Sequence, residues 1–121
     1  MNYSVYTSDE ALGRRIEADW GSIVWLADGR IGNTSGLTLG RVVIKTGRSN
    51  PRHAHQNCEE ALHLLSGRLE HSAGEETVTL EPGDTLVVAA GVFHNAASCG
   101  DDDANMIVAY SSATRDFVKE E

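Results

Sequence analysis

Four side chains that can bind a metal ion occur at short spacings in the middle of the chain. His53 and His55 are two residues apart, so on an extended chain both imidazoles point to the same side. Glu60 follows shortly after them, and His94 comes after a run of apolar residues and a turn. Three imidazoles and one carboxylate suit a borderline divalent ion, namely Fe, Mn, Ni, Cu or Zn. The sequence therefore predicts one divalent-metal site built from these four residues.

Only one of the two neighbouring carboxylates can point into the protein, because adjacent strand residues face opposite sides. Glu60 shares its side with Leu62 and Leu64, and nothing polar follows on that side. Glu59 shares its side with His63. A buried carboxylate needs a metal ion or a charged partner. We therefore expect Glu60 to be a ligand, and we expect Glu59 and His63 to face outward.

The coordination number decides what such a site can do. A six-coordinate ion keeps two positions for water, substrate or O2, whereas a tetrahedral zinc ion is closed by four ligands and is structural. Open positions on a first-row metal favour catalysis. The competing interpretation is four unrelated polar residues, some of them hydrogen-bonded in a core, which would leave the buried carboxylate in need of another partner.

The elements that must position these residues are short strands. Apolar runs alternate with turn sequences rich in glycine, proline and aspartate. The expected strands are 22–26, 36–40 and 41–45 (one strand or two), 59–65, 68–72, 77–80, 85–89 and 106–110. Residues 9–18 are expected to form a short helix or a loop, with Ser8 as the cap. Regularly spaced strands without intervening helices predict an all-β sandwich or barrel.

The length of 121 residues indicates a single domain. We divide it into an N-terminal arm or short helix (1–20), a barrel core (21–111) and a C-terminal tail (112–121). The formal net charge of −8 repels phosphate backbones and anionic lipid, so we expect binding to neither nucleic acid nor membrane. No signal sequence is evident, and two cysteines make no disulfide framework, so we expect a cytoplasmic protein.

Two segments resemble the conserved motifs of the cupin superfamily. Residues 47–67 read Gly-x5-His-x-His-x4-Glu-x6-Gly, and residues 82–94 read Pro-Gly-Asp-x4-Ala-Ala-Gly-Val-Phe-His. The second segment departs from the family pattern at Ala89, where cupins have proline, and at Ser98, where they often have asparagine. Neither change removes a ligand. The resemblance implies a double-stranded β-helix, the jelly-roll barrel of cupins, with His53, His55, Glu60 and His94 as metal ligands.

Small single-domain cupins with this ligand set include dioxygenases, decarboxylases, lyases and isomerases. The resemblance therefore implies a small-molecule metalloenzyme, in the first place a dioxygenase whose metal binds O2 and an oxygen-bearing substrate together. The alternative is a metal-assisted lyase or isomerase acting on a sugar-acid or hydroxy-carbonyl substrate. Residues 110–117 support it, because they resemble the end of small cupins linked to uronate-type sugar breakdown. A cupin that holds a metal or ligand without turnover is the third interpretation, since no dedicated base stands out.

Several side chains outside the ligand set could shape the pocket. His71 is the candidate catalytic base, although a partly exposed histidine near a hairpin is an equally good interpretation. Cys58 lies between His55 and Glu60, and Cys99 lies just after His94, so we expect both segments to approach the metal. The alternative interpretation is that both cysteines are simply small, half-buried residues. An apolar wall over a ligand could be formed by Trp20, Trp25 and Phe93. Packing in the hydrophobic core is the default interpretation for all three residues.

The outward side of the strand at 59–65 predicts self-association. Ala61, His63 and Leu65 lie on this side and are too apolar to prefer water. Small cupins commonly pair through a sheet, so we expect a homodimer.

Overall fold

Buried and exposed residues alternate along the strands, because one face of each sheet covers a core. In the computed structural model, which describes residues 2–121, every second residue of β10 from Ala104 to Tyr110 is buried. In β5, Leu62 and Leu64 are buried while His63 between them is exposed. This period of two is the pattern of extended chain with one face against a core.

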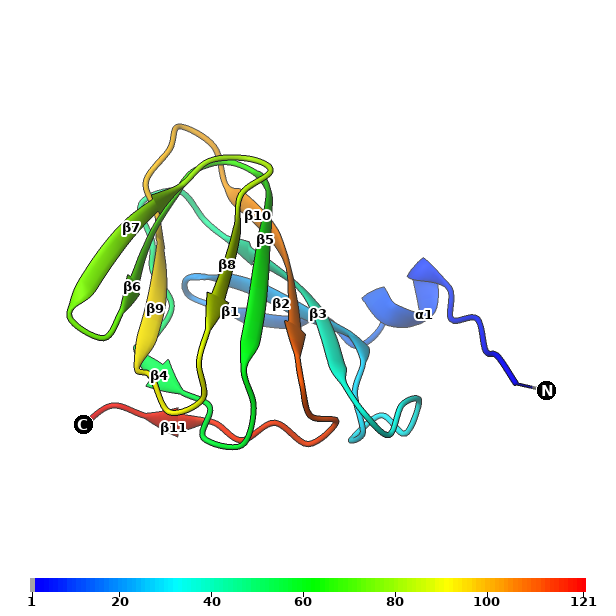
Figure 1. Ribbon diagram of the computed structural model, residues 1–121. Helices are drawn as coiled ribbons and strands as arrows, with labels where there is room; N and C mark the ends of the chain where they lie inside the picture. The colour runs from blue at the N-terminus through cyan, green and yellow to red at the C-terminus, as the bar shows by residue number, and fades with distance from the viewer. Residues whose placement is uncertain (1) are drawn as a thin grey trace.

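The strands form two antiparallel sheets that face each other (Figure 1). The six-stranded sheet has the order β1-β2-β3-β10-β5-β8, and the five-stranded sheet has the order β11-β4-β9-β6-β7. The elements are α1 (Ser8–Leu12), β1 (Ile16–Ala18), β2 (Gly21–Ala27), β3 (Thr38–Ile44), β4 (His53–Ala54), β5 (Glu60–Ser66), β6 (Leu69–Ala73), β7 (Glu76–Leu80), β8 (Thr85–Val88), β9 (His94–Ser98), β10 (Ala104–Tyr110) and β11 (Val118–Lys119). The all-β jelly-roll architecture expected from the sequence is confirmed.

The expected helix over 9–18 is too long. The helix α1 begins at Ser8 and ends at Leu12, and its cap is Thr7, whose side chain accepts a hydrogen bond from the Glu10 amide. Ile16–Ala18 is instead a strand, because it pairs with β2 at the edge of the larger sheet. No helix among residues 2–121 is long and apolar enough to cross a membrane.

Gly40 in β3 leaves room for the Trp25 ring of β2, the strand beside it. A Cβ at position 40 would lie 2.7 Å from two carbons of that ring. We expect Gly40→Ala to displace the ring and to lower the free energy of unfolding by about 1–3 kcal/mol. Urea denaturation measures this change. The matched control is Gly36→Ala, where the added Cβ would meet open space; equal losses in the two variants would contradict the prediction.

Candidate metal centre

The two sheets bring the four predicted ligands to one place. His53 in β4 lies opposite His94 in β9 in the smaller sheet, and His55 follows directly after β4. Glu60 begins β5 in the larger sheet and is only 5% exposed, whereas Glu59 is exposed, as the alternation of the strand predicted. One ligand atom from each of the four residues lies within 4.8 Å of all the others. This arrangement is a compact, buried divalent-metal site.

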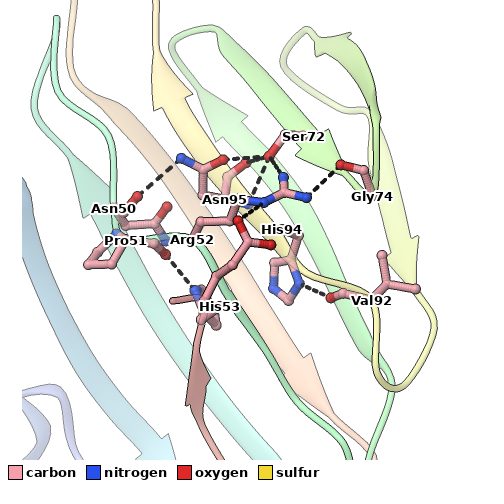
Figure 2. Close-up of polar contacts among 10 residues, drawn as sticks. Asn50, Pro51, Arg52, His53, Ser72, Gly74, Val92, His94 and Asn95 are labelled. Carbon is pink, nitrogen blue, oxygen red and sulfur yellow. Dashed lines mark hydrogen bonds and ion pairs between the residues drawn. The ribbon is translucent and has the colours of Figure 1, made fainter.

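The three imidazoles are held so that the same nitrogen of each faces the site. In every ring Nδ1 lies within hydrogen-bond distance of a backbone carbonyl, which can only accept, so Nδ1 carries the proton. Nε2 is then the nitrogen that each ring can offer to a metal ion, and that of His94 lies 3.0 Å from a Glu60 oxygen. The pairs are His53 with Pro51 at 2.6 Å, His55 with Asp116 at 2.6 Å and His94 with Val92 at 2.9 Å; Figure 2 shows the first and the last.

The charges of the site fit a metal ion. The Glu60 carboxylate lies 3.0 Å from Nε2 of His94 and 3.4 Å from Nε2 of His55. Burial alone would raise the pKa of Glu60, but its contacts with the two imidazoles outweigh burial and lower that pKa to about 2. Nε2 of His55 is buried without a hydrogen-bond partner, which is the state that metal coordination relieves. The ionised Glu60 carboxylate, which lies beside Nε2 of two imidazoles, is thus ready to bind a divalent cation.

A polar network behind the site fixes the strand that carries His53 (Figure 2). The Arg52 guanidinium donates to Ser72 Oγ at 2.9 Å, to the Gly74 carbonyl at 2.6 Å and to Glu120 at 2.9 Å. Ser72 is also hydrogen-bonded to Asn95, the residue next to His94. These bonds tie β4 to β6, β9 and the C-terminal segment, so the ligands are held by more than one strand.

The C-terminal segment also contacts the ligands directly. Besides holding His55 through its carbonyl, Asp116 accepts a hydrogen bond from the Gln56 amide through its side chain. Asn57 donates to the Thr114 carbonyl at 2.9 Å. The Phe117 ring stacks on His53 with 4.6 Å between ring centroids. The last residues therefore complete the metal centre.

A cavity of about 250 Å³ opens beside the ligands. Its walls are mostly apolar and include Trp20 and Trp25, as the sequence allowed, but not Phe93. His71 also lines it and is only 1% exposed, so it is a pocket residue and not a half-exposed one. Its ring stacks on His94 with centroids 5.6 Å apart, and burial lowers its pKa to about 4. His71 is thus a neutral imidazole facing the same space as the ligands.

The expectation that both cysteine segments approach the metal is wrong for Cys99. His94 begins β9 and Cys99 follows the other end of this strand, roughly 16 Å away at about 3.3 Å per residue. Cys99 is exposed, and Cys58 is buried in the hydrophobic core cluster. Neither cysteine is a member of the ligand cluster.

Known proteins share both the sequence pattern and the fold. A family model described as "Cupin domain" matches residues 40–110. Germin-like protein 3-8 of Oryza sativa subsp. japonica is 35% identical over 85 residues, covering 66% of this chain and 38% of the relative. Polyketide synthase CurC of Streptomyces cyaneus is 30% identical over 77 residues, covering 64% of this chain and 49% of the relative. The chain thus spans less than half the length of these relatives.

Solved structures show the same fold at low sequence identity. Oxalate decarboxylase from Bacillus subtilis superposes with a TM-score of 0.82 at 17% identity, covering 91% of this chain and 30% of that one. A recombinant oxalate oxidase in complex with glycolate gives a TM-score of 0.77 at 21% identity, covering 85% and 56%. With its family motifs, jelly-roll fold and divalent-metal site, the chain belongs to the cupin family.

Proposed function

We propose that the protein is a metal-dependent enzyme of dioxygenase type acting on a small, oxygen-bearing organic molecule. The observation that carries this proposal is that the ligands occupy one side of a cavity whose other walls are mostly apolar. Four protein donors leave two positions of a six-coordinate ion, and the cavity gives a substrate room to reach them. A structural zinc ion closed by four ligands would need no such space.

The chain's own residues would prepare this chemistry. A bound ion would supply Lewis acidity and, if it is redox-active, the electrons that O2 requires. The apolar walls exclude water, which strengthens every charge interaction inside the cavity. Nδ1 of His71 is buried without a hydrogen-bond partner among the described residues, so this imidazole is free to hold or move a proton beside the substrate.

Oxygen consumption tests the proposal directly. Protein loaded separately with Fe, Mn, Cu, Ni and Zn would be screened against small hydroxy acids, diols and enols in an oxygen electrode. We expect substrate-dependent uptake of O2 with a redox-active metal. Turnover without O2 uptake would indicate the lyase or isomerase alternative, and binding without turnover would indicate a ligand-binding cupin; either result overturns the proposal.

His71→Asn is expected to lower kcat by at least ~100-fold, the usual contribution of a positioned acid or base. Metal content should stay at the wild-type level, because His71 is not one of the four ligands. Steady-state kinetics and elemental analysis on the same sample measure both quantities. His63→Asn is the matched control, because His63 faces outward and contacts Thr85. Loss of metal together with activity would show that His71 only supports the ligands.

We also propose that the protein forms a homodimer through the outer face of the larger sheet. Its β10–β5–β8 part carries an apolar patch in which Val87 is 61% and Leu65 is 45% exposed. Strand register places Ala61 between Ala109 and Val87 on this face. We expect sedimentation of a dimer at micromolar concentration and of a monomer for Val87→Glu. The matched control is Val78→Glu on β7, which is exposed in the other sheet; a wild-type monomer would contradict the proposal.

A further inference from the structure

Among residues 2–121, Arg115 is the one lysine or arginine that lines the cavity beside the ligands. Its guanidinium carbon lies 4.1 Å from the centre of the Trp25 ring and 5.2 Å from that of Tyr110. Arg115, Trp25 and Phe117 also line a second, more open hollow. Arg115 therefore lies where the metal-side cavity meets the outer hollow.

The Arg115 side chain has no anionic partner among the described residues. Its Nε is buried and makes no hydrogen bond. The nearby carboxylates contact other groups: Asp116 accepts from the Gln56 amide, Asp28 accepts from the Arg30 amide, and Glu60 lies beside two of the histidine ligands. The side chain is half-buried, so its remaining N–H donors, which make no hydrogen bond to the described residues, are accessible to a ligand in the cavity.

The chemistry of that ligand follows from the guanidinium. Arginine presents a planar fork of N–H donors that matches the two oxygens of a carboxylate. Contact with the Trp25 ring restrains the side chain without using those donors. A phosphate dianion fits less well, because its second charge would meet apolar walls and not another lysine or arginine. In a chain of net charge −8, the Arg115 guanidinium at the cavity also guides an anion to this place.

We propose that Arg115 binds a carboxylate of the substrate while a second oxygen function of the same molecule faces the metal ligands. The substrate is then a small organic acid whose carbon chain lies against Trp25 and Phe117. The metal-bound end of this inference rests on the proposed function. The carboxylate end rests on Arg115 alone.

Binding of matched acids tests the inference without measuring turnover. Protein loaded with one equivalent of Co(II) would be titrated by calorimetry with succinate, glutarate and adipate. Each diacid is compared with the monoacid of the same carbon number, namely butyrate, valerate and hexanoate. We expect at least one diacid to bind ~10-fold or more tightly than its monoacid, because the second carboxylate gains a charge-assisted hydrogen bond.

Arg115→Gln should abolish this preference, and Arg115→Lys, which keeps the charge but loses the fork, should reduce it. The control Arg15→Gln removes the same charge from an exposed pair with Glu17 and should leave the preference unchanged. Circular dichroism and Co(II) stoichiometry check that the variants are folded. Absence of any diacid preference, or its survival in Arg115→Gln, would overturn the inference.

The outcomes also separate this inference from the proposed function. A diacid preference that depends on Arg115, without O2 uptake on any substrate, overturns the dioxygenase and supports the carboxylate site. Oxygen uptake on neutral substrates, with no preference for diacids, supports the dioxygenase and overturns the carboxylate site. If Co(II) does not bind, the same acids are titrated into metal-free protein and binding is measured by tryptophan fluorescence. The affinity for the diacids must then still differ between wild type and Arg115→Gln.

Discussion

Glu60→Gln is expected to lower the affinity for a divalent ion by at least ~100-fold, whereas Glu59→Gln should change it by less than about twofold. Glutamine keeps the shape of the side chain but removes the one negative charge among the four ligands. It also removes the negative charge beside Nε2 of His55 and Nε2 of His94. Glu59 is exposed and is not one of the four ligands.

The measurement has two parts. Elemental analysis of wild-type protein, purified without chelators or a nickel column, should find close to one first-row divalent ion per chain. Competition with a chromogenic chelator then gives the affinities of both variants. Wild-type protein that carries no metal and binds none on titration would remove the basis of the functional conclusion. A larger loss of metal affinity in Glu59→Gln than in Glu60→Gln would mean that the assigned alternation of β5 is wrong by one residue.

The metal-free protein is expected to lose stability steeply as the pH falls from 6.5 to about 4. Burial is the main reason that the pKa values of His53 and His71 fall from 6.5 to about 4 in the folded state. In this pH window the unfolded chain binds protons that the folded chain does not, so stability decreases with falling pH. Each histidine accounts for up to ~3 kcal/mol.

The other two groups of the site act differently on this pH dependence. Burial opposes protonation of His94, but the Glu60 carboxylate outweighs it and raises the pKa of His94. Its contribution is present below pH 6.5 and is lost only as the pH rises through the folded pKa, so it changes little between pH 6.5 and 4. The lowered pKa of Glu60 contributes stability above about pH 4.5, which is lost as the pH falls toward 2. We therefore expect a net loss of roughly 5 kcal/mol between pH 6.5 and 4, most of it from His53 and His71.

Urea denaturation of chelator-treated protein at several pH values measures this loss. His71→Asn removes one of the two responsible groups, so its stability should depend less on pH than that of the wild type. His63→Asn again serves as the control, since His63 is exposed. Equal pH dependence in wild type and His71→Asn would contradict the assignment of the loss to buried histidine.

The parts of the structure that the sequence predicted are those set by local spacing. The ligands could be found because two of them share one side of an extended chain and Glu60 follows the alternation of β5. Where long-range pairing decides, prediction failed. Ile16–Ala18 is a strand only because β2 lies beside it, and Arg115 and Phe117 reach the site only because the chain returns to β4 after β10. No local pattern encodes such contacts.

The hydrogen bond between His55 and the Asp116 carbonyl joins residues 61 positions apart, and it has a consequence for biosynthesis. A ribosome delivers His53 and His55 long before it has made Asp116 and Phe117. Until those residues emerge, Nδ1 of His55 has no carbonyl to fix it and His53 has no ring stacked on it. The complete donor set therefore forms only after translation has passed this point. Which divalent ion the protein acquires is then decided by the ions available in the compartment where the finished chain folds.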